Sequence, residues 1–326
     1  MKNINWGITG TGRIARTFSD ALAKTQNAVL YAVASRSKNK AENFAQEYGF
    51  SKAYGSYSEL AQDNNIDIVY IATPMASHFN DVMLCLENGK NVLCEKSVTL
   101  NSEQLEKILS KAKEKKLFFM EAMWTKCRPV FLKTMEWVKN NRIGDIKYIK
   151  ADFSNNVKYN PDDRLFRADC GGGALLDLAV YPLSFAEAFL GYPDEIISFA
   201  HIRDGIDLSN SITLKYNNAF VSIDSGFEIS LKNNAIISGT DGYIILGDWF
   251  FCTCDAVLYD RNGSEIEKFN AQNIINGYEY EIIEAQRCIC ENLKESPLIP
   301  HSGTISVMKI MDECRRQWGL KFPDEQ

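Results

Sequence analysis

The first 123 residues are predicted to form an α/β domain with a doubly wound parallel sheet. Five apolar segments alternate with segments of helical periodicity, and a glycine-rich turn follows the first apolar segment. Strands that are apolar throughout, rather than alternating, indicate a parallel sheet covered by helices on both faces. The predicted strands are 4–10, 28–36, 66–74, 91–96 and 117–122.

Four helices are expected between these strands. Residues 13–24 place Ile14, Phe18 and Leu22 at helical spacing, which predicts one buried stripe. Residues 101–116 begin with Asn101 or Ser102, both of which are favoured helix caps. The other predicted helices are 38–49 and 77–89.

The turn after the first strand has the pattern of a dinucleotide site. In "GITGTGRIA", Gly10 permits a tight turn, Gly12 lets the backbone approach a pyrophosphate, and Ala15 allows the helix to pack closely on the strand. The amides at the start of the helix then face the phosphates. This turn therefore predicts a Rossmann-type cofactor site whose remaining members are Thr11, Arg13 and Ile14.

The end of the second strand indicates which dinucleotide is bound. An NAD site usually carries an acid there for the ribose hydroxyls. This chain instead has Ser35, Arg36 and Lys40, with no acid before Glu42. Guanidinium and hydroxyl groups can bind a 2′-phosphate, which a carboxylate would repel. NADP(H) is therefore the expected cofactor, with NAD(H) as the alternative.

Composition excludes several other classes. The chain has 326 residues, 45% hydrophobic and 24% charged, with a formal net charge of −6, so nucleic acid and anionic membranes are not expected partners. No signal segment and no stretch of 18 apolar residues is expected, which favours a cytoplasmic protein. Nine scattered cysteines and three histidines give no zinc-ligand spacing, so no metal is predicted.

The second half contains apolar strands separated by turn residues. A helix is expected at 129–140, and two helices, roughly 278–294 and 303–318, are expected near the end. The predicted strands are 146–154, 195–203, 211–217, 219–227, 233–240, 242–250 and 255–260.

One segment of the second half raises a chemical question. "CGGGALLDLAVYPLSF", residues 170–185, runs from three glycines into an apolar helix carrying Asp177 and Tyr181. Residues four apart share a helix face, about 5–6 Å from each other. Asp177 as a solvated carboxylate and Tyr181 as core packing are the alternatives to a catalytic pair.

Five motifs in order, "GITGTGRIA", "IATPMASH", "CEKS", "EAMW" and "GGGALLDLAVYP", resemble the Gfo/Idh/MocA oxidoreductase family. Within it the chain is most similar to the branch of dimeric dihydrodiol dehydrogenases and NADP-dependent D-xylose dehydrogenases. The resemblance implies that residues 1–123 bind the cofactor. It also implies that residues 124–326 form a domain with a large, mostly antiparallel open-faced sheet for substrate binding and oligomerisation, most simply as a homodimer.

The resemblance also implies roles for single residues. Lys96 stands where the family has its catalytic lysine, although Ser97 replaces the usual proline. Asp177 and Tyr181 match the branch in which tyrosine replaces histidine as the acid/base. Residues expected to shape the cofactor site are Thr73, Pro74, His78 and Glu95.

The expected substrate is a small sugar, polyol or dihydrodiol. Trp124 and Phe153 are predicted to line its pocket, and Arg164 and Arg167 could close over it. The predicted reaction transfers hydride between a CH–OH group and the nicotinamide. An NADP-binding regulatory protein without turnover is the alternative.

Overall fold

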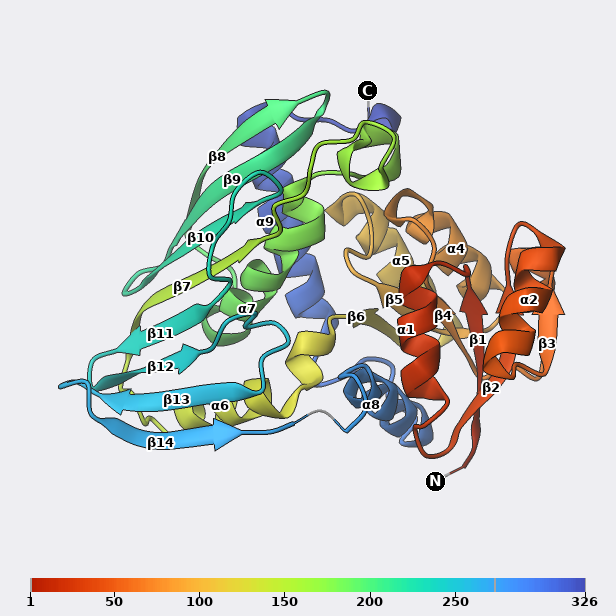
Figure 1. The fold of residues 1–326 in the computed structure, drawn as a ribbon, viewed down its shortest axis with the longest axis horizontal. Coiled ribbons are helices and arrows are strands. Elements are labelled where there is room, and N and C mark those ends of the chain that lie inside the picture. The colour runs from red at the N-terminus through yellow and green to blue at the C-terminus, as the bar shows by residue number, and fades with distance from the viewer. Residues whose placement is uncertain (1, 273, 326) are drawn as a thin grey trace. The chain divides into compact units, whose positions relative to one another are not determined.

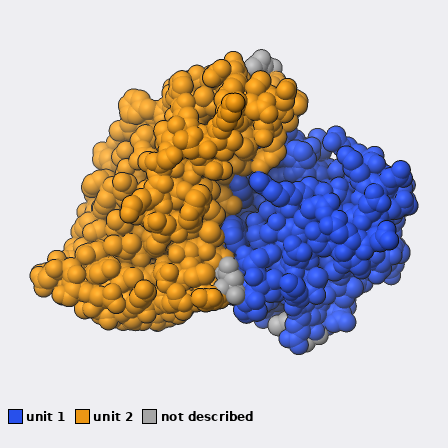
Figure 2. All heavy atoms as spheres, viewed as in Figure 1, with its two compact units in different colours: residues 1–124, 273–301 blue, residues 125–272, 302–326 orange. Residues whose placement is uncertain are grey.

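A computed structural model describes residues 2–272 and 274–325. The chain forms two compact units, one of residues 1–124 and 273–301 and the other of residues 125–272 and 302–326, coloured separately in Figure 2. The predicted second domain, 124–326, is continuous, whereas the compact units assign 273–301 to the first unit. The first unit is therefore built from two separate stretches of the chain.

The sheet of the first unit has six parallel strands in the order β3-β2-β1-β4-β5-β6. The predicted doubly wound fold is confirmed, and all residues of β4 are buried, as expected for a strand covered on both faces. The one strand not predicted is β3, which is only three residues long and carries no apolar run. The strands are β1 (Ile4–Thr9), β2 (Ala28–Ala34), β3 (Lys52–Tyr54), β4 (Ile68–Ile71), β5 (Asn91–Glu95) and β6 (Phe119–Ala122).

Helices connect these strands on both faces of the sheet (Figure 1). Because the strand order reverses between β1 and β4, right-handed crossovers place the helices of the two halves on opposite faces. Asn101 is the N-cap of α5, and its side chain accepts a hydrogen bond from the Gln104 amide at 2.9 Å. The helices are α1 (Arg13–Leu22), α2 (Lys38–Tyr48), α3 (Tyr57–Ala61), α4 (Met75–Glu87), α5 (Ser102–Lys115) and α8 (Glu279–Cys290).

The segment that returns to the first unit contacts the edge of its sheet. The Phe119 amide of edge strand β6 donates to the Lys294 carbonyl at 3.1 Å. The Phe119 carbonyl lies 2.9 Å from Nε2 of His301. An edge strand presents unpaired backbone groups, and here the returning segment pairs them at Phe119.

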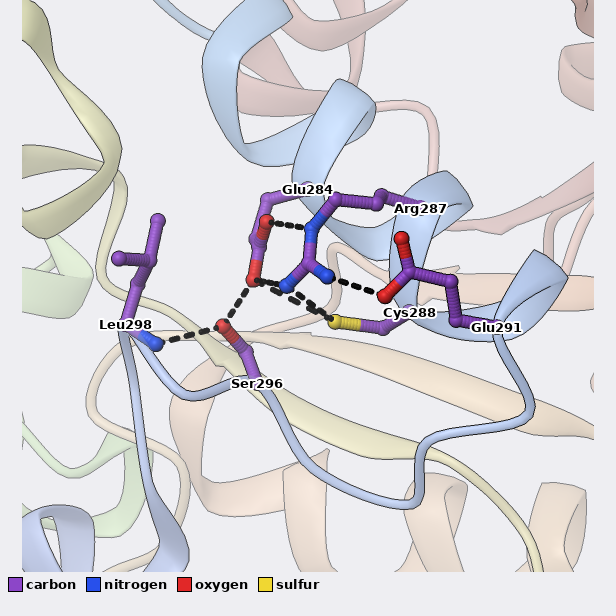
Figure 3. Close-up of polar contacts among 6 residues, drawn as sticks. All are labelled: Glu284, Arg287, Cys288, Glu291, Ser296 and Leu298. Atoms are coloured by element: carbon purple, nitrogen blue, oxygen red, sulfur yellow. Dashed lines mark hydrogen bonds and ion pairs between the residues drawn. The ribbon is translucent and has the colours of Figure 1, made fainter.

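A polar network holds the loop after α8 against that helix (Figure 3). The buried Glu284 carboxylate accepts two hydrogen bonds from Arg287, each 2.9 Å long, and one from the Ser296 hydroxyl at 2.5 Å. Ser296 in turn accepts from the Leu298 amide at 3.0 Å. Burial alone would raise the pKa of Glu284, but these hydrogen bonds outweigh it and lower that pKa. The loop after α8 is thereby bound to the helix by an ionised carboxylate.

The second unit is built on an eight-stranded sheet in the order β14-β13-β12-β11-β7-β10-β9-β8. Among the described strands of this sheet, only β7 and β10 pair in parallel, so the prediction of a mostly antiparallel sheet is confirmed. The polar strand β14 was not predicted. The strands are β7 (Ile146–Ser154), β8 (Glu195–Arg203), β9 (Ile206–Lys215), β10 (Phe220–Gly226), β11 (Ala235–Gly239), β12 (Gly242–Leu246), β13 (Asp255–Asp260) and β14 (Glu265–Asn270).

The helices of this unit lie on one face of its sheet (Figure 1). Ser198 of β8 points toward them, since its hydroxyl donates to Gln317 of α9 at 2.8 Å. Side chains alternate along a strand, so Ile197 and Phe199 point the other way, and they are 46% and 72% exposed. The helices are α6 (Pro129–Lys139), α7 (Val180–Leu190) and α9 (His301–Trp318).

The segment Ala168–Leu190 of the second unit is more apolar than was predicted from the sequence. Within the described residues, Ala168–Leu190 has the length and the mean hydropathy, 1.4, that a membrane span needs. In this protein, however, 72% of that window is buried. A core helix of a folded domain passes the same test, so the stretch is weak evidence for a membrane.

Candidate active site

The turn after β1 has the geometry that a dinucleotide site requires. Gly10 has φ +94°, and a Cβ there would lie 2.8 Å from the Ala72 carbonyl oxygen. A Cβ at Gly12 would meet nothing within 4 Å, so no protein contact explains that glycine. Ala15, in the first turn of α1, is fully buried. The residues present therefore fit a pyrophosphate placed against the start of α1.

The end of β2 presents basic side chains at the same edge of the sheet. Arg36 is exposed. Burial raises the pKa of the Asp81 carboxyl, and the charge of Arg36 opposes part of that shift. The ammonium of Lys38 is bound by the Ala53 carbonyl instead. Lys40 is exposed in the first turn of α2. Of Arg36, Lys38 and Lys40, Arg36 is thus the one whose charge acts on a buried acid, Asp81. Asp81 was not predicted as part of the site.

The loop after β4 is held by α4. The Thr73 hydroxyl donates to Asp81 at 2.6 Å. Nε2 of buried His78 lies 2.9 Å from the Thr73 carbonyl, and Nδ1 lies 3.0 Å from the Ser97 carbonyl. Burial lowers the pKa of His78, which favours the neutral ring. His78 therefore joins the ends of β4 and β5, a placement that suits loop shaping better than proton transfer.

Lys96 directly follows the last residue of β5. It is half-buried, and its peptide bond to Ser97 is cis. The preceding residue, Glu95, is buried and accepts a hydrogen bond from the hydroxyl of buried Tyr70. Carboxyl ends of parallel strands are where ligands bind in such sheets, and Lys96 lies at this edge together with the turns after β1, β2 and β4.

A further acid, Glu281 of α8, is buried in the first unit. Both of its carboxyl oxygens lack a hydrogen-bond partner within the described residues. Burial, followed by the charge of Glu95, raises the pKa of Glu281 well above its usual value. Such an environment favours the protonated form of the carboxyl. Glu281 was not predicted, because nothing in its local sequence pattern distinguishes it from a solvated helix acid.

The glycine run of the second unit is required by contacts within that unit. A Cβ at Gly172 would lie 2.7 Å from the Leu165 carbonyl oxygen. Gly173 has φ +121°, and a Cβ there would lie 2.4 Å from an oxygen of Asp207. Contacts inside this unit therefore explain why Gly172 and Gly173 are glycines.

The segment that carries Asp177 differs from the predicted α-helix. Leu175–Ala179 forms a π-helical turn before α7 begins at Val180. Short π-helical insertions are frequent at functional sites. Nη1 of Arg164 lies 3.6 Å from the Asp177 carboxylate, whereas Arg167 is bound to Asp169 at 3.0 Å. Of the two arginines considered from sequence, Arg164 is the one that contacts a predicted site residue.

Tyr181 lies among aromatic rings of the second unit. Its ring centroid is 5.4 Å from that of Phe153 and 5.0 Å from that of Phe251. Phe153 and Phe251 stack at 4.3 Å. Phe251 was not predicted, since it lies in a turn about 100 residues from Phe153 along the chain. Trp124 belongs to the first unit, where it stacks on Tyr278 at 4.5 Å.

The predicted residues thus form two groups. In the first unit, the cofactor residues and Lys96 gather at the carboxyl edge of the parallel sheet. In the second unit, Asp177 and Tyr181 lie in one helical segment beside the Phe153 ring. One group can bind an anionic dinucleotide, and the other offers a carboxylate and a phenol.

Both parts of the chain match known protein families. Residues 4–123 match the oxidoreductase family with an NAD-binding Rossmann fold, and residues 131–245 match the GFO/IDH/MocA C-terminal domain. The trans-1,2-dihydrobenzene-1,2-diol dehydrogenase of Xenopus laevis is 36% identical, covering 98% of this chain and 99% of its own. The human enzyme of that name is 32% identical over 99% of both chains.

Two solved structures share the fold. KijD10, a 3-ketoreductase from Actinomadura kijaniata in complex with NADP and TDP-benzene, has a TM-score of 0.86 at 25% identity, covering 97% of this chain and 98% of its own. Levoglucosan dehydrogenase in complex with NADH and L-sorbose has a TM-score of 0.84 at 18% identity, with the same coverage. The predicted nicotinamide cofactor is confirmed at the level of NAD(P). The chain belongs to the GFO/IDH/MocA oxidoreductase family and is an NAD(P)-dependent dehydrogenase.

Proposed function

We propose that this protein is an NADP-dependent dehydrogenase that transfers hydride between a CH–OH group of a small sugar, polyol or dihydrodiol and the nicotinamide. The observation that carries the proposal is the buried phenol of Tyr181 in one helical segment with Asp177. The substrate class is supported by the relatives named as dihydrodiol dehydrogenases.

Oxidation of an alcohol requires a base. The bound nicotinamide supplies the hydride acceptor, and Tyr181 takes the hydroxyl proton. A phenol has a pKa of about 10 in water, so lowering it to near 7 requires about 4 kcal/mol. The ammonium of Lys96 favours the phenolate in this proposal. Asp177 orients Lys96 or a substrate hydroxyl, and Phe153 and Trp124 bind the carbon skeleton.

Turnover tests this function directly. We expect absorbance at 340 nm to rise when the protein is mixed with NADP⁺ and a panel of aldoses, polyols and dihydrodiols. NADPH binding without turnover of any substrate in the panel, in either direction, would instead favour the regulatory protein. Soaking crystals with NADP⁺ and the best substrate would then identify the pocket.

We expect Arg36→Ala to raise the KM for NADP⁺ by about 10- to 100-fold, because a charge-assisted hydrogen bond is worth about 1.5–3 kcal/mol. The KM for NAD⁺ should be nearly unchanged, since NAD⁺ has no 2′-phosphate. Steady-state kinetics with both cofactors measures this. Lys24→Ala, an exposed cation after α1, is the matched control. Equal losses with both cofactors would assign Arg36 to neutralising Asp81 or to the shared part of the site.

We also propose that the exposed face of the second sheet forms a homodimer. Ile197, Phe199 and Phe220 are 46%, 72% and 52% exposed, and aligned strand positions place them on one face. Exposed apolar side chains gathered on one face suit a self-complementary interface. Light scattering at micromolar concentration should give about twice the chain mass, and a mass near 36.9 kDa would contradict the dimer.

A further inference from the structure

A buried carboxylate lies behind the segment that carries Asp177. Asp207, on β9, is 2% exposed. Its Oδ2 accepts a hydrogen bond of 2.8 Å from the backbone amide of Leu175, the first residue of the π-helical turn. The amide groups at the start of a helix have no partner within the helix, so a carboxylate here satisfies one of them.

A second layer of hydrogen bonds holds Asp207 in place. The side-chain amide of Asn210 donates a hydrogen bond to Oδ2 of Asp207 at 2.8 Å. The Ser225 hydroxyl in turn donates to Oδ1 of Asn210 at 2.9 Å. All three side chains are buried. On the other side, Gly173 lies so close that only a glycine fits. The carboxylate is thus held between Asn210 of its own strand and the glycine run.

We propose that Asp207 is a positioning residue, which fixes the start of the helical segment and thereby the placement of Asp177 and Tyr181. It acts through the Leu175 amide. The proposal rests on the proposed roles of Asp177 and Tyr181. Because Leu175 is two residues from Asp177, a shift at this amide moves the catalytic segment directly.

Because the Asp207 carboxyl can ionise, its proposed role can be tested by varying the pH. Burial raises the pKa of Asp207 to about 7, although the hydrogen bonds from Asn210 and Leu175 oppose the shift. The other groups that face it are on α9: the Arg315 guanidinium, which is paired with Asp312 and Glu325, and the Cys314 thiol.

The raised pKa of Asp207 determines whether its contribution to the free energy of unfolding rises or falls with pH. An unfolded aspartate has a pKa of about 3.9. Between about pH 4 and pH 7 the folded protein keeps a proton on Asp207 that the unfolded chain releases. The contribution of Asp207 to the free energy of unfolding therefore falls as pH rises through this window. The N–H donors of Leu175 and Asn210 form stronger hydrogen bonds with the ionised carboxylate than with the neutral carboxyl.

Two variants separate positioning from packing. Asp207→Ala removes the acceptor, and we expect faster amide hydrogen exchange in peptides covering residues 173–181 with no change in peptides from α6. With turnover measurable, kcat should fall by about 10- to 100-fold, while the Kd for NADPH stays within about twofold. Ser198→Ala, which removes a part-buried hydrogen bond on the neighbouring strand β8, is the control and should change neither readout.

Asp207→Asn keeps the shape and one oxygen acceptor, and covers the case in which the alanine variant does not fold. It should recover most of the kcat at pH 8 and flatten the pH dependence of the free energy of unfolding between pH 4 and 7. Unchanged exchange at 173–181, or faster exchange with unchanged kcat, would overturn the proposal. If the wild-type protein turns over no substrate, the proposed function fails. The exchange experiment then decides alone whether Asp207 holds the segment.

Discussion

Replacing Tyr181 with phenylalanine is expected to lower kcat by about 10²–10⁴, the usual contribution of a general acid or base. The variant keeps the ring and its contacts with Phe153 and Phe251, but it lacks the ionisable oxygen. The Kd for NADP⁺ should not change, because the dinucleotide motif lies in the other unit. Steady-state kinetics with the best substrate, together with cofactor titration, measures both effects.

Tyr192→Phe provides the control for this experiment. Tyr192 follows α7 and is 51% exposed, so loss of its hydroxyl should leave kcat unchanged. Retention of most activity by Tyr181→Phe would show that Tyr181 serves packing. The base would then be sought first in Lys96, since both ring nitrogens of His78 face backbone carbonyls.

Lys96→Met is expected to lower kcat and to shift the basic limb of the pH–rate profile upward. Methionine keeps much of the side-chain length but removes the ammonium, and a phenol without a nearby positive charge releases its proton less readily. The profile between about pH 6 and pH 10 measures the shift. Lys107→Met, which changes an exposed lysine of α5, is the control.

The double variant of Lys96 and Tyr181 tests whether the two residues act together. Groups that act as one unit give losses that do not add, so the double variant should be hardly worse than the poorer single variant. Additive losses would show that Lys96 contributes independently of the Tyr181 proton, for example by binding the substrate.

The first unit was largely predictable because its signals are local. An apolar run followed by a glycine turn and an amphipathic helix indicates a parallel strand and its crossover, whatever the rest of the chain does. The five predicted strands and the Asn101 cap are all present. Strands β3 and β14 were missed because short, polar edge strands carry no apolar pattern.

Residues of the candidate site could be predicted only where they belong to a sequence motif. Gly10, Arg36 and Lys96 are each the last residue of a predicted strand, and parallel strands bring their carboxyl ends to one edge. Phe251 and Asp207 have no such motif. Their relation to Tyr181 and Leu175 depends on contacts between residues far apart in the sequence, which no local pattern encodes.

By itself, the sequence determined the doubly wound sheet, the dinucleotide turn and the types of residue available for catalysis, since each depends on neighbours along the chain. Only the tertiary structure decided that residues 274–301 return to the first unit, and that Gly172 and Gly173 make room for a carbonyl and a carboxylate. It also decided that the predicted α-helix starts with a π-helical turn. These features arise from packing and hydrogen bonds between distant segments, which exist only once the chain has folded.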